Sequence, residues 1–338
     1  MTRYLILLGS LGVAVAVALG WRLWADLNQP MPISEEGYVF EVATGRTLTS
    51  VARELGQQGL LEHPRSFAWY GRLAGLAEKI QAGEYHLVTG TTPVTMLEQL
   101  VNGRVKLHSL TVVEGWTLRE LLAAIRAHPA LRQTLNEPSP AELVALLNLD
   151  VPHPEGMFFP DTYAFPRGIS DVELLRQARD LMRRHLDEAW ASRRGELPLQ
   201  NAYEALILAS IVERETALDS ERAQVAGVFV RRLQRGMRLQ TDPTVIYGLG
   251  ASFDGNLRKR DLQSDTPYNT YTRAGLPPTP IALPGKRSLE AAVNPDQGNA
   301  IYFVATGLDD GSHYFAETLE EHNAAVGRYL ARLREQGQ

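Results

Sequence analysis

A long apolar run near the start of the chain predicts a helix that can cross a membrane. Positions 4–21 carry no charged residue, whereas Arg3 precedes the run and Arg22 follows it. At about 1.5 Å per residue, a helix of this length just spans a hydrocarbon core of about 30 Å. Trp21 and Trp24 flank Arg22, as is typical of side chains at a membrane interface. We therefore expect residues 1–27 to form a cytoplasmic tip and a transmembrane signal anchor.

A cleaved signal peptide is the alternative interpretation of this run. Such a signal has a shorter apolar core that ends at a cleavage site of the A-x-A type, whereas the A-V-A triplets of this chain lie inside the run. Both interpretations deliver the rest of the chain outside the cytoplasm. We expect a single-pass protein of the cell inner (plasma) membrane with its catalytic part on the extracytoplasmic side, although Arg3 and Arg22 have opposing effects on the orientation.

One pattern, a short β-like run followed by a glycine and a helical segment, occurs three times between residues 39 and 125. The three segments are FEVATGRTLTSVARELG, YHLVTGTTPVTMLEQLVNG and LTVVEGWTLRELLAAI. Each turn glycine is followed two positions later by a threonine, in the pairs Gly45 and Thr47, Gly90 and Thr92, Gly115 and Thr117. Glycine permits a tight exit from a strand, and threonine can cap the first turn of a helix. Each segment therefore predicts a strand, a turn and a helix.

The first two segments enclose a predicted α+β module at residues 38–105. A second helix is expected near residues 65–77 and a return strand near residues 84–87. The order strand, helix, helix, strand, with its Gly-x-Thr-Leu turn, resembles a LysM module. A generic α+β unit that binds no carbohydrate is the alternative. Residues 106–150 are expected to form an α+β connecting unit.

The pattern changes at Asp150, and we expect residues 151–338 to fold as a larger mixed α+β domain. The segment VPHPEGMFFPDTYAFP is rich in proline and aromatic residues, which predicts an ordered loop. Helices are expected at 171–193, 202–216 and 220–235, followed by an extended run in GMRLQTDPTVIYGLG. The long segment TPYNTYTRAGLPPTPIALPG has no regular period, and such loops tend to be functional. A strand at 301–305 and a helix from Leu319, capped by Thr318 and Glu321, follow.

The composition narrows the class of protein. Of the 338 residues, 44% are hydrophobic and 22% are charged, which is typical of a globular chain with a sizeable core. The net charge of −5 argues against a nucleic-acid-binding protein. The chain has no cysteine, and its eight histidines form no HExxH motif and no close pair. We therefore expect no metal site and no cofactor.

The segment LASIVERET carries the candidate chemistry. Residues 205–212 are apolar except for Ser210, which predicts a buried helix. Two carboxylates, Glu213 and Glu215, stand at its C-terminal end, where the helix dipole disfavours acids. The dipole and burial both raise the pKa of a carboxyl group. A carboxyl that stays protonated near neutral pH can act as the general acid that protonates a departing glycosidic oxygen.

Helix geometry does not choose between these two carboxylates. Residues i and i+2 of a helix point about 200° apart, so Glu213 and Glu215 cannot share a face. We expect one to enter a cleft and the other to pack against a partner or meet solvent. Arg214 and Arg222 could neutralise either, and a salt-bridged helix end without catalytic function is the alternative interpretation.

Longer motifs resemble those of a known family. The string ASIVERETALDSERAQVAGVFVRRLQRGMRLQTDPTVIYGLG, with YNTYTRAGLPP, FVATG and EGMFFPDTY, closely resembles the endolytic murein transglycosylases of the YceG-like family. The resemblance extends over nearly the whole chain. It implies a membrane-anchored enzyme that cuts nascent peptidoglycan glycan strands internally, between N-acetylmuramic acid and N-acetylglucosamine, and leaves a 1,6-anhydromuramoyl end. Peptidoglycan synthases of the wall-elongation machinery are implied as partners.

The resemblance further implies one essential glutamate, which maps onto Glu215. Thr216 follows it, as a hydroxyl residue follows the catalytic glutamate of related lytic transglycosylases, and Glu213 is the second candidate. A single carboxylate fits this chemistry because the C6 hydroxyl of the substrate takes the place of the attacking water. Glu215 would protonate the leaving oxygen and then accept the proton of that hydroxyl.

The irregular segments supply candidates for substrate binding, because sugar sites favour aromatic faces beside amides and hydroxyls. Together with Glu213, the candidates are Gln240, Thr241, Asp242, Tyr247, Asn269 and Tyr271, and Tyr268 and Thr270 belong to the same loops. As alternatives, Asp242 and Asn269 are turn residues that hold the loops, and Tyr247 and Tyr271 belong to the core. Glu155 and Asp161 are further candidates, although PEG and PDT are also ordinary turn sequences.

Two other functions are compatible with these residues. A muramidase would use Asp242 or another acid as a second carboxylate and would release a reducing muramic acid end. A non-catalytic anchored scaffold would bind peptidoglycan through the LysM-like unit, and replacing Glu215 with glutamine would leave all its activities intact.

Overall fold

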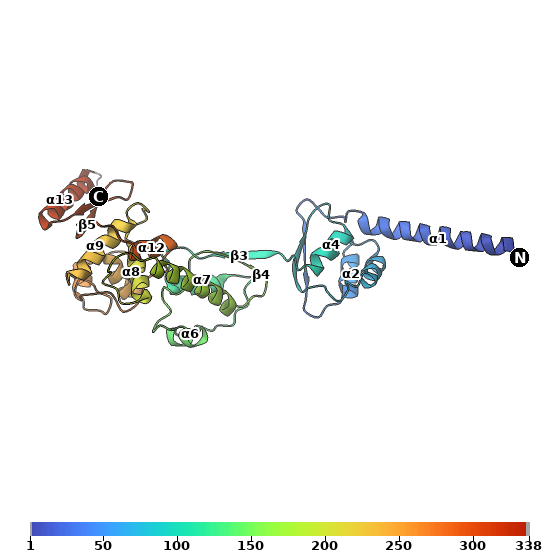
Figure 1. The fold of residues 1–338 in the computed structure, drawn as a ribbon, viewed down its shortest axis with the longest axis horizontal. Helices are drawn as coiled ribbons and strands as arrows, with labels where there is room; N and C mark the ends of the chain where they lie inside the picture. Colours follow the sequence, from blue (N-terminus) through green and yellow to red (C-terminus); the bar gives the residue numbers. More distant parts are fainter. Residues whose placement is uncertain (1, 336–338) are drawn as a thin grey trace. The chain divides into compact units, whose positions relative to one another are not determined.

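The computed structural model describes residues 2–335, with side chains from residue 10 onward. The chain divides into two compact units (Figure 1). The first comprises Met1–His108 and Ala164–Gly168, and the second comprises Ser109–Tyr163 and Ile169–Gln338. The predicted boundaries at 38–105, 106–150 and 151–338 stay predictions.

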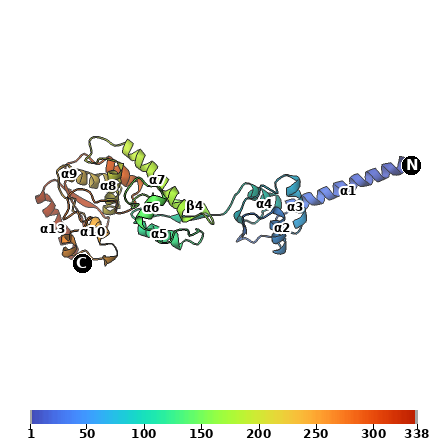
Figure 2. The ribbon, with the colours of Figure 1, turned by 90° about the horizontal axis from the view of Figure 1, so that it is seen from below.

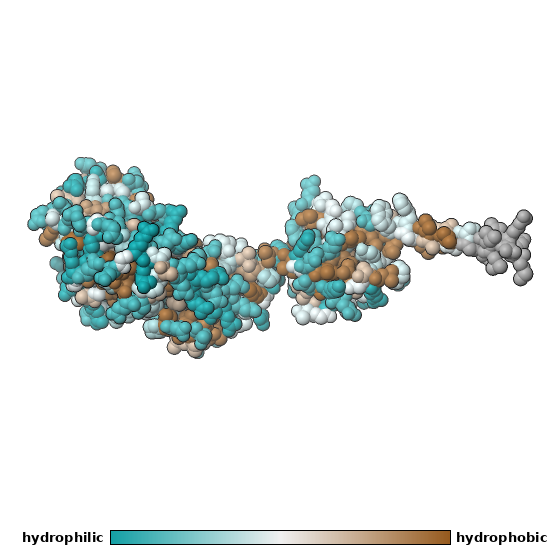
Figure 3. Space-filling model, viewed as in Figure 1, coloured by the Kyte–Doolittle hydropathy of each residue, from teal (hydrophilic) through white to brown (hydrophobic). Residues whose placement is uncertain are grey.

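The first unit begins with the predicted long helix, α1 (Thr2–Asn28). Its part from Ser10 to Asn28 is long and apolar enough to cross a membrane, and only 6% of that span is buried. Apolar side chains cover much of the exposed stretch next to the rest of the unit (Figure 3). Only its last turns enter the core, where Leu27 is buried. The helix is consistent with the expected single-pass anchor.

The remainder of the first unit has the strand and helix order that the sequence predicts. Its elements are β1 (Tyr38–Val42), α2 (Leu48–Gln57), α3 (Pro64–Leu73), β2 (Gly83–Leu87) and α4 (Pro93–Val101). β1 pairs antiparallel with β2, with Tyr38 opposite Leu87. The apolar face of α2 packs against α3 over a core that includes Phe67 and Tyr85. The α+β class is confirmed, and the likeness to a LysM module stays a prediction.

The second unit is mostly helical (Figures 1 and 2). The strands β3 (Leu107–Thr111) and β4 (Thr162–Pro166) each have residues in both units. The first helices of the second unit are α5 (Leu118–Ala127), α6 (Pro140–Leu146), α7 (Asp171–Ala191), α8 (Ala202–Glu215) and α9 (Arg222–Gln234). They are followed by α10 (Asp242–Leu249), α11 (Lys259–Gln263), α12 (Lys286–Val293), β5 (Tyr302–Ala305), β6 (His313–Ala316) and α13 (Leu319–Glu335). β3 pairs with β4, and β5 pairs antiparallel with β6.

Helix α8 is the central element of this unit. It contacts α7, α9, α10 and α12, and all eight residues from Ala205 to Val212 are buried. This confirms the buried helix that its apolar sequence predicts. The packing fixes the direction of α8 and therefore the position of its C-terminal turn, which carries the two candidate carboxylates.

The threonine caps are confirmed at all three repeated segments. The hydroxyls of Thr47, Thr92 and Thr117 each accept a hydrogen bond from the backbone three residues later, at the starts of α2, α4 and α5. The capping contacts between Thr318 and Glu321 at α13 are also present. Local side-chain chemistry therefore starts these helices as predicted.

Two predictions about secondary structure are wrong. The end of VPHPEGMFFPDTYAFP is the strand β4 rather than loop, because its residues pair with β3. The run TDPTVIYGL, predicted as extended, is the helix α10. Pro243 lies in its first turn, where a missing N–H costs nothing, and the Thr244 hydroxyl donates to the carbonyl of Thr241. The proline marks a helix start here rather than an extended chain.

Candidate active site

Glu215 is the last residue of α8, and its partly buried carboxylate is held by the side chain of Thr241, the residue just before α10. The hydroxyl of Thr241 donates a hydrogen bond to its Oε1. Burial is the main cause that raises the pKa of Glu215 from 4.5 to about 7; the bond from Thr241 lowers this pKa, and the negative charge of Asp242 adds to the rise. The raised pKa agrees with the expectation from the buried helix end.

The donor to Glu215 is itself held by a cluster of buried threonines. The backbone N–H of Thr241 donates to Thr270 Oγ1 at 3.1 Å, and the hydroxyls of Thr270 and Thr244 lie 2.9 Å apart. All three threonines are buried. The cluster holds the backbone of Thr241 through its N–H and its carbonyl, and it therefore positions the residue whose hydroxyl bonds the carboxylate.

Glu213 lies in a different environment, as expected from its spacing of two residues from Glu215. Its Oε1 pairs with Arg222 Nη1 at 3.2 Å, and its Oε2 accepts the backbone N–H of Gly285 at 2.9 Å. Its side chain is only 6% exposed. Arg214 donates instead to the carbonyl of Gly115 at 3.1 Å. Of the two arginines, Arg222 therefore neutralises Glu213, and Arg214 does not.

Ser210, the polar interruption in the apolar helix, holds part of the long irregular segment. Its hydroxyl donates to the carbonyl of Ile207 at 2.7 Å and accepts the N–H of Ile281 at 3.0 Å. The same segment exchanges two backbone hydrogen bonds with the turn before α5, through Leu283 with Gly115 and Trp116. The irregular segment is thus fixed on α8 by specific contacts.

The other predicted binding residues from α10 and the irregular loop differ in what they contact. Tyr271 donates its hydroxyl to Asp242 Oδ1 at 2.6 Å, close enough to Glu215 that the charge of Glu215 helps raise the pKa of Tyr271. Asn269 is fully buried, and its amide bonds four backbone groups of its own loop. Gln240 has a φ of 53°, and its N–H donates to the carbonyl of Thr270.

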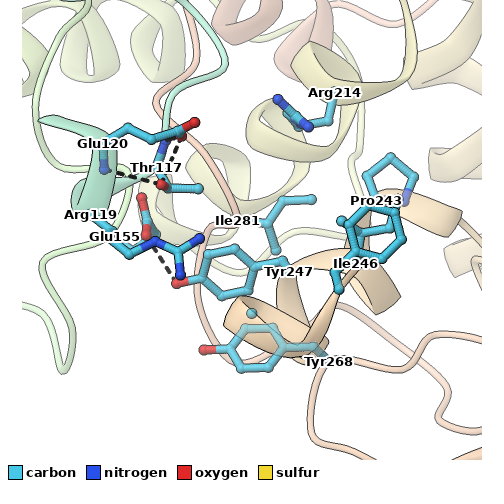
Figure 4. Close-up of a pocket in the computed structure, with 12 residues that line it drawn as sticks. Thr117, Arg119, Glu120, Glu155, Arg214, Pro243, Ile246, Tyr247, Tyr268 and Ile281 are labelled. Atoms are coloured by element: carbon cyan, nitrogen blue, oxygen red, sulfur yellow. Dashed lines mark hydrogen bonds between the residues drawn. The ribbon is translucent and has the colours of Figure 1, made fainter. Parts of the chain in front are cut away.

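A cavity of about 500 Å³ lies beside this site (Figure 4). Arg214 and Pro243, the chain neighbours of Glu215 and Asp242, contribute to its wall. Tyr247 packs edge-to-face on Tyr268, with ring centroids 4.9 Å apart. The cavity therefore has aromatic surface and is bounded by chain neighbours of Glu215 and Asp242.

Glu155 contributes a second buried carboxyl to this cavity. It is 2% exposed, accepts the N–H of Leu118 at 2.8 Å and accepts the Tyr247 hydroxyl at 3.0 Å. Burial raises its pKa to about 7, although both of these hydrogen bonds lower it. Asp161, by contrast, is exposed and accepts the N–H of Thr162 at 2.7 Å. The EGMFFPDTY motif could have separated them, because Glu155 precedes a buried run whereas Asp161 follows one.

These features define an α+β protein with a partly buried carboxyl of raised pKa at the end of a buried helix. The chain belongs to the YceG-like family, whose model matches residues 40–328. It is 32% identical to the endolytic murein transglycosylase of Bacillus subtilis, over 86% of this chain and 84% of that protein. It is 26% identical to the endolytic murein transglycosylase of Streptococcus pneumoniae, over 92% of this chain and 62% of that protein. A crystal structure of a YceG-like protein from Listeria monocytogenes matches with a TM-score of 0.54 and 29% identity, over 86% of this chain and 99% of that one.

Proposed function

We propose that this chain is an endolytic murein transglycosylase that cleaves peptidoglycan glycan strands without hydrolysis. The observation that carries the proposal is the environment of Glu215, a partly buried carboxyl that accepts one hydroxyl bond and has a pKa near 7. Such a group exchanges a proton in both directions at neutral pH, which a single-carboxylate mechanism requires. Family membership supports the choice of substrate.

In the proposed reaction, Glu215 acts first as acid and then as base. Its proton passes to the glycosidic oxygen as the bond from that oxygen to C1 of N-acetylmuramic acid breaks. The C6 hydroxyl of the same sugar then attacks C1 and gives its proton to the carboxylate, which restores the starting form. The attack is intramolecular, so proximity replaces a second carboxylate, and the site must exclude water.

The proposed roles of the surrounding residues follow from their contacts. Thr241 orients the carboxylate and stabilises its charged form between the two proton transfers. Asp242, which accepts the Tyr271 hydroxyl, keeps a negative charge near Glu215 that favours its protonated form. Tyr247 and Tyr268 offer aromatic surface to the sugars. Glu213 holds the end of α8 through Arg222 and Gly285.

We further infer that α1 anchors the protein in the cell inner membrane, with the rest of the first unit and the second unit on the extracytoplasmic side. The length and apolar composition of α1 support this placement. We assign the module at 38–105 a role in holding the glycan strand, on the basis of its LysM-like order of elements. Peptidoglycan synthases remain the proposed partners, by family resemblance.

Mass spectrometry of glycan products tests the reaction type. The full chain in detergent is incubated with purified glycan strands, in parallel with the variants Glu215→Gln and Glu213→Gln. We expect internal cuts whose muramic acid ends are lighter by one water than reducing ends, and we expect Glu215→Gln to abolish them. Reducing muramic acid ends would identify a muramidase instead, and unchanged cleavage by Glu215→Gln would remove the proposed role of this residue.

A further inference from the structure

The cavity beside Glu215 continues into a second one along α5. The second cavity has a volume of about 360 Å³ and shares Arg119, Glu155 and Tyr247 with the first. We call the two together the α5 groove. One end lies at Arg214, next to Glu215 in the chain, and the other at Arg126, in the last turn of α5. All of these residues belong to the second unit.

The outer part of the α5 groove has largely apolar walls, and three arginines lie along the groove. The apolar lining of the outer part consists of Leu118, Leu122, Ala123, Pro138 and Pro140. Arg119 is exposed, and no ion pair or hydrogen bond to its guanidinium is found among the described residues 2–335. Figure 4 shows it beside Glu155 and Tyr247, with Arg214 across the inner cavity.

The carboxylates of the groove do not neutralise these arginines. Glu120 is engaged in the cap of α5, where its Oε2 accepts the backbone N–H and the hydroxyl of Thr117. Glu155 is bonded by Leu118 and Tyr247. Arg214 bonds only a backbone carbonyl. Arg126 is paired at 3.3 Å with Glu137, but both are exposed. Among the residues that the structure describes, the inner groove therefore presents two cationic side chains, Arg119 and Arg214, without a paired anion.

We propose that the α5 groove binds the peptide stem of the muramic acid residue at the cleaved bond, with the stem carboxylates on Arg119 and Arg214. This inference rests on the proposed function, because it takes peptidoglycan as the substrate. In a strand that carries stems, the lactyl carboxyl of each muramic acid is tied up in the amide bond to the stem, so the sugars are uncharged, whereas the stem carries carboxylates and small aliphatic side chains. A groove with apolar walls and unpaired arginines is complementary to that substituent.

The position of the groove favours the stem over an unrelated peptide. The stem is attached to the same sugar whose C1 must lie at Glu215 during cleavage. It therefore has to leave the glycan within a short distance of that residue, and Arg214, one residue away in the chain, lines the inner cavity. A groove that continues from the inner cavity lets the strand and its stem bind at the same time.

A comparison of two substrates tests this proposal kinetically. Glycan strands that carry stems are compared with the same strands after an amidase has removed them, and the ratio of the two kcat/KM values is measured. We expect a ratio above about 10 for the wild type, and a fall of about tenfold or less in Arg119→Gln, mainly through KM, because one charge-assisted contact is lost. Arg119→Lys should recover part of the ratio. Arg183→Gln is the matched control, since Arg183 is an exposed arginine on α7 that lines neither cavity.

A binding measurement separates failure of this proposal from failure of the proposed function. The full-length Glu215→Gln variant is titrated calorimetrically with a soluble N-acetylmuramoyl tetrapeptide and with the same compound after its carboxylates are amidated. We expect the carboxylate form to bind about tenfold more tightly, and Arg119→Gln to remove the difference. Cleavage with equal kcat/KM for both strands and no binding difference would overturn the stem site alone. Arg119-dependent binding without any strand cleavage would overturn the proposed function and leave the stem site standing.

Discussion

The last turn of α8 carries two carboxylates that lie in different environments on its two sides. On one side, Glu213 is paired with Arg222 and accepts a backbone N–H. On the other side, Glu215 has no cation paired with it among the described residues, lies near the negative Asp242 and accepts one hydroxyl bond. The two residues share a helix end and a residue type, so the difference arises from the segments that pack against each face.

The difference in environment distinguishes a carboxylate that stabilises the fold from a carboxyl group that is suited to proton transfer. A buried carboxylate that is paired and hydrogen-bonded contributes to the fold, because removing it leaves a buried cation without a partner. A carboxyl held out of water beside another acid stays protonated to higher pH and destabilises the folded state once the solution is alkaline enough to ionise it. Proteins retain such groups chiefly at functional sites.

The largest expected effect is on catalysis by Glu215→Gln. An amide cannot donate or accept the proton, so we expect the cleavage rate to fall by about 10²- to 10⁴-fold. Release of anhydro ends from purified strands is the measurement, with circular dichroism to verify folding. Glu196→Gln, at an exposed glutamate before α8, is the control and should keep full activity. Normal turnover by Glu215→Gln would mean that Glu215, like Glu213, has only a structural role.

The next largest effect is on stability, in Glu213→Gln. Glutamine keeps an acceptor for Gly285 but removes the buried anion of Arg222, whose remaining carboxylate partner is the half-exposed Asp219 at 3.1 Å, so we expect a loss of at most about 3 kcal/mol in the free energy of unfolding. Urea denaturation followed by tryptophan fluorescence measures it. Adding Arg222→Met to Glu213→Gln should restore part of the loss. If Glu213→Gln unfolds at the wild-type urea midpoint, the pair contributes nothing to the fold.

A smaller, pH-dependent effect on stability is expected from Glu215→Gln. The pKa of Glu215 is raised from 4.5 to about 7 in the folded protein. The resulting stability is fully present below pH 4.5 and is lost as the pH rises through 7, because the unfolded chain ionises first. Glutamine does not titrate there, so we expect the variant to gain about 1–3 kcal/mol over the wild type between pH 5 and pH 8.5. Thermal unfolding at both pH values measures it, and a difference in Tm that is the same at both would show that Glu215 is not held protonated.

How much of this contrast the sequence could predict depends on the range of the interactions. The burial of α8, the caps at Thr47, Thr92 and Thr117, and the opposite directions of Glu213 and Glu215 follow from local periodicity and spacing. The partners of the two carboxylates do not, because Arg222, Gly285 and Thr241 come from separate segments. Their positions depend on how those segments pack on α8. The pairing of Arg222 with Glu213 therefore follows from the three-dimensional structure and not from the sequence.

The two wrong predictions have the same origin. The segment that forms β4 is rich in proline and aromatic residues, and its strand character comes from pairing with β3, which lies about 50 residues away in the sequence. The Asp242–Pro243 pair fits both a turn and a helix start, and the packing of α10 on α8 decides between them. Glu155 was a weak candidate from sequence, since its contact with Tyr247 joins residues 92 positions apart.

The smallest and most discriminating effects are opposite shifts in the pH profile of kcat/KM. A general acid must be protonated, so the rate should fall as the pH rises through the pKa of Glu215, about 7. The Thr241 bond lowers that pKa and the charge of Asp242 raises it. Thr241→Val should therefore move the alkaline limb to higher pH and Asp242→Asn to lower pH, each by about half a unit. Shifts of both variants in the same direction would mean that a group other than Glu215 causes the alkaline fall in kcat/KM. Glu155 is the first alternative, because its pKa is also near 7. Repeating the profile with Glu155→Gln distinguishes the two carboxyls, because only the titrating one can abolish the alkaline limb when it is replaced.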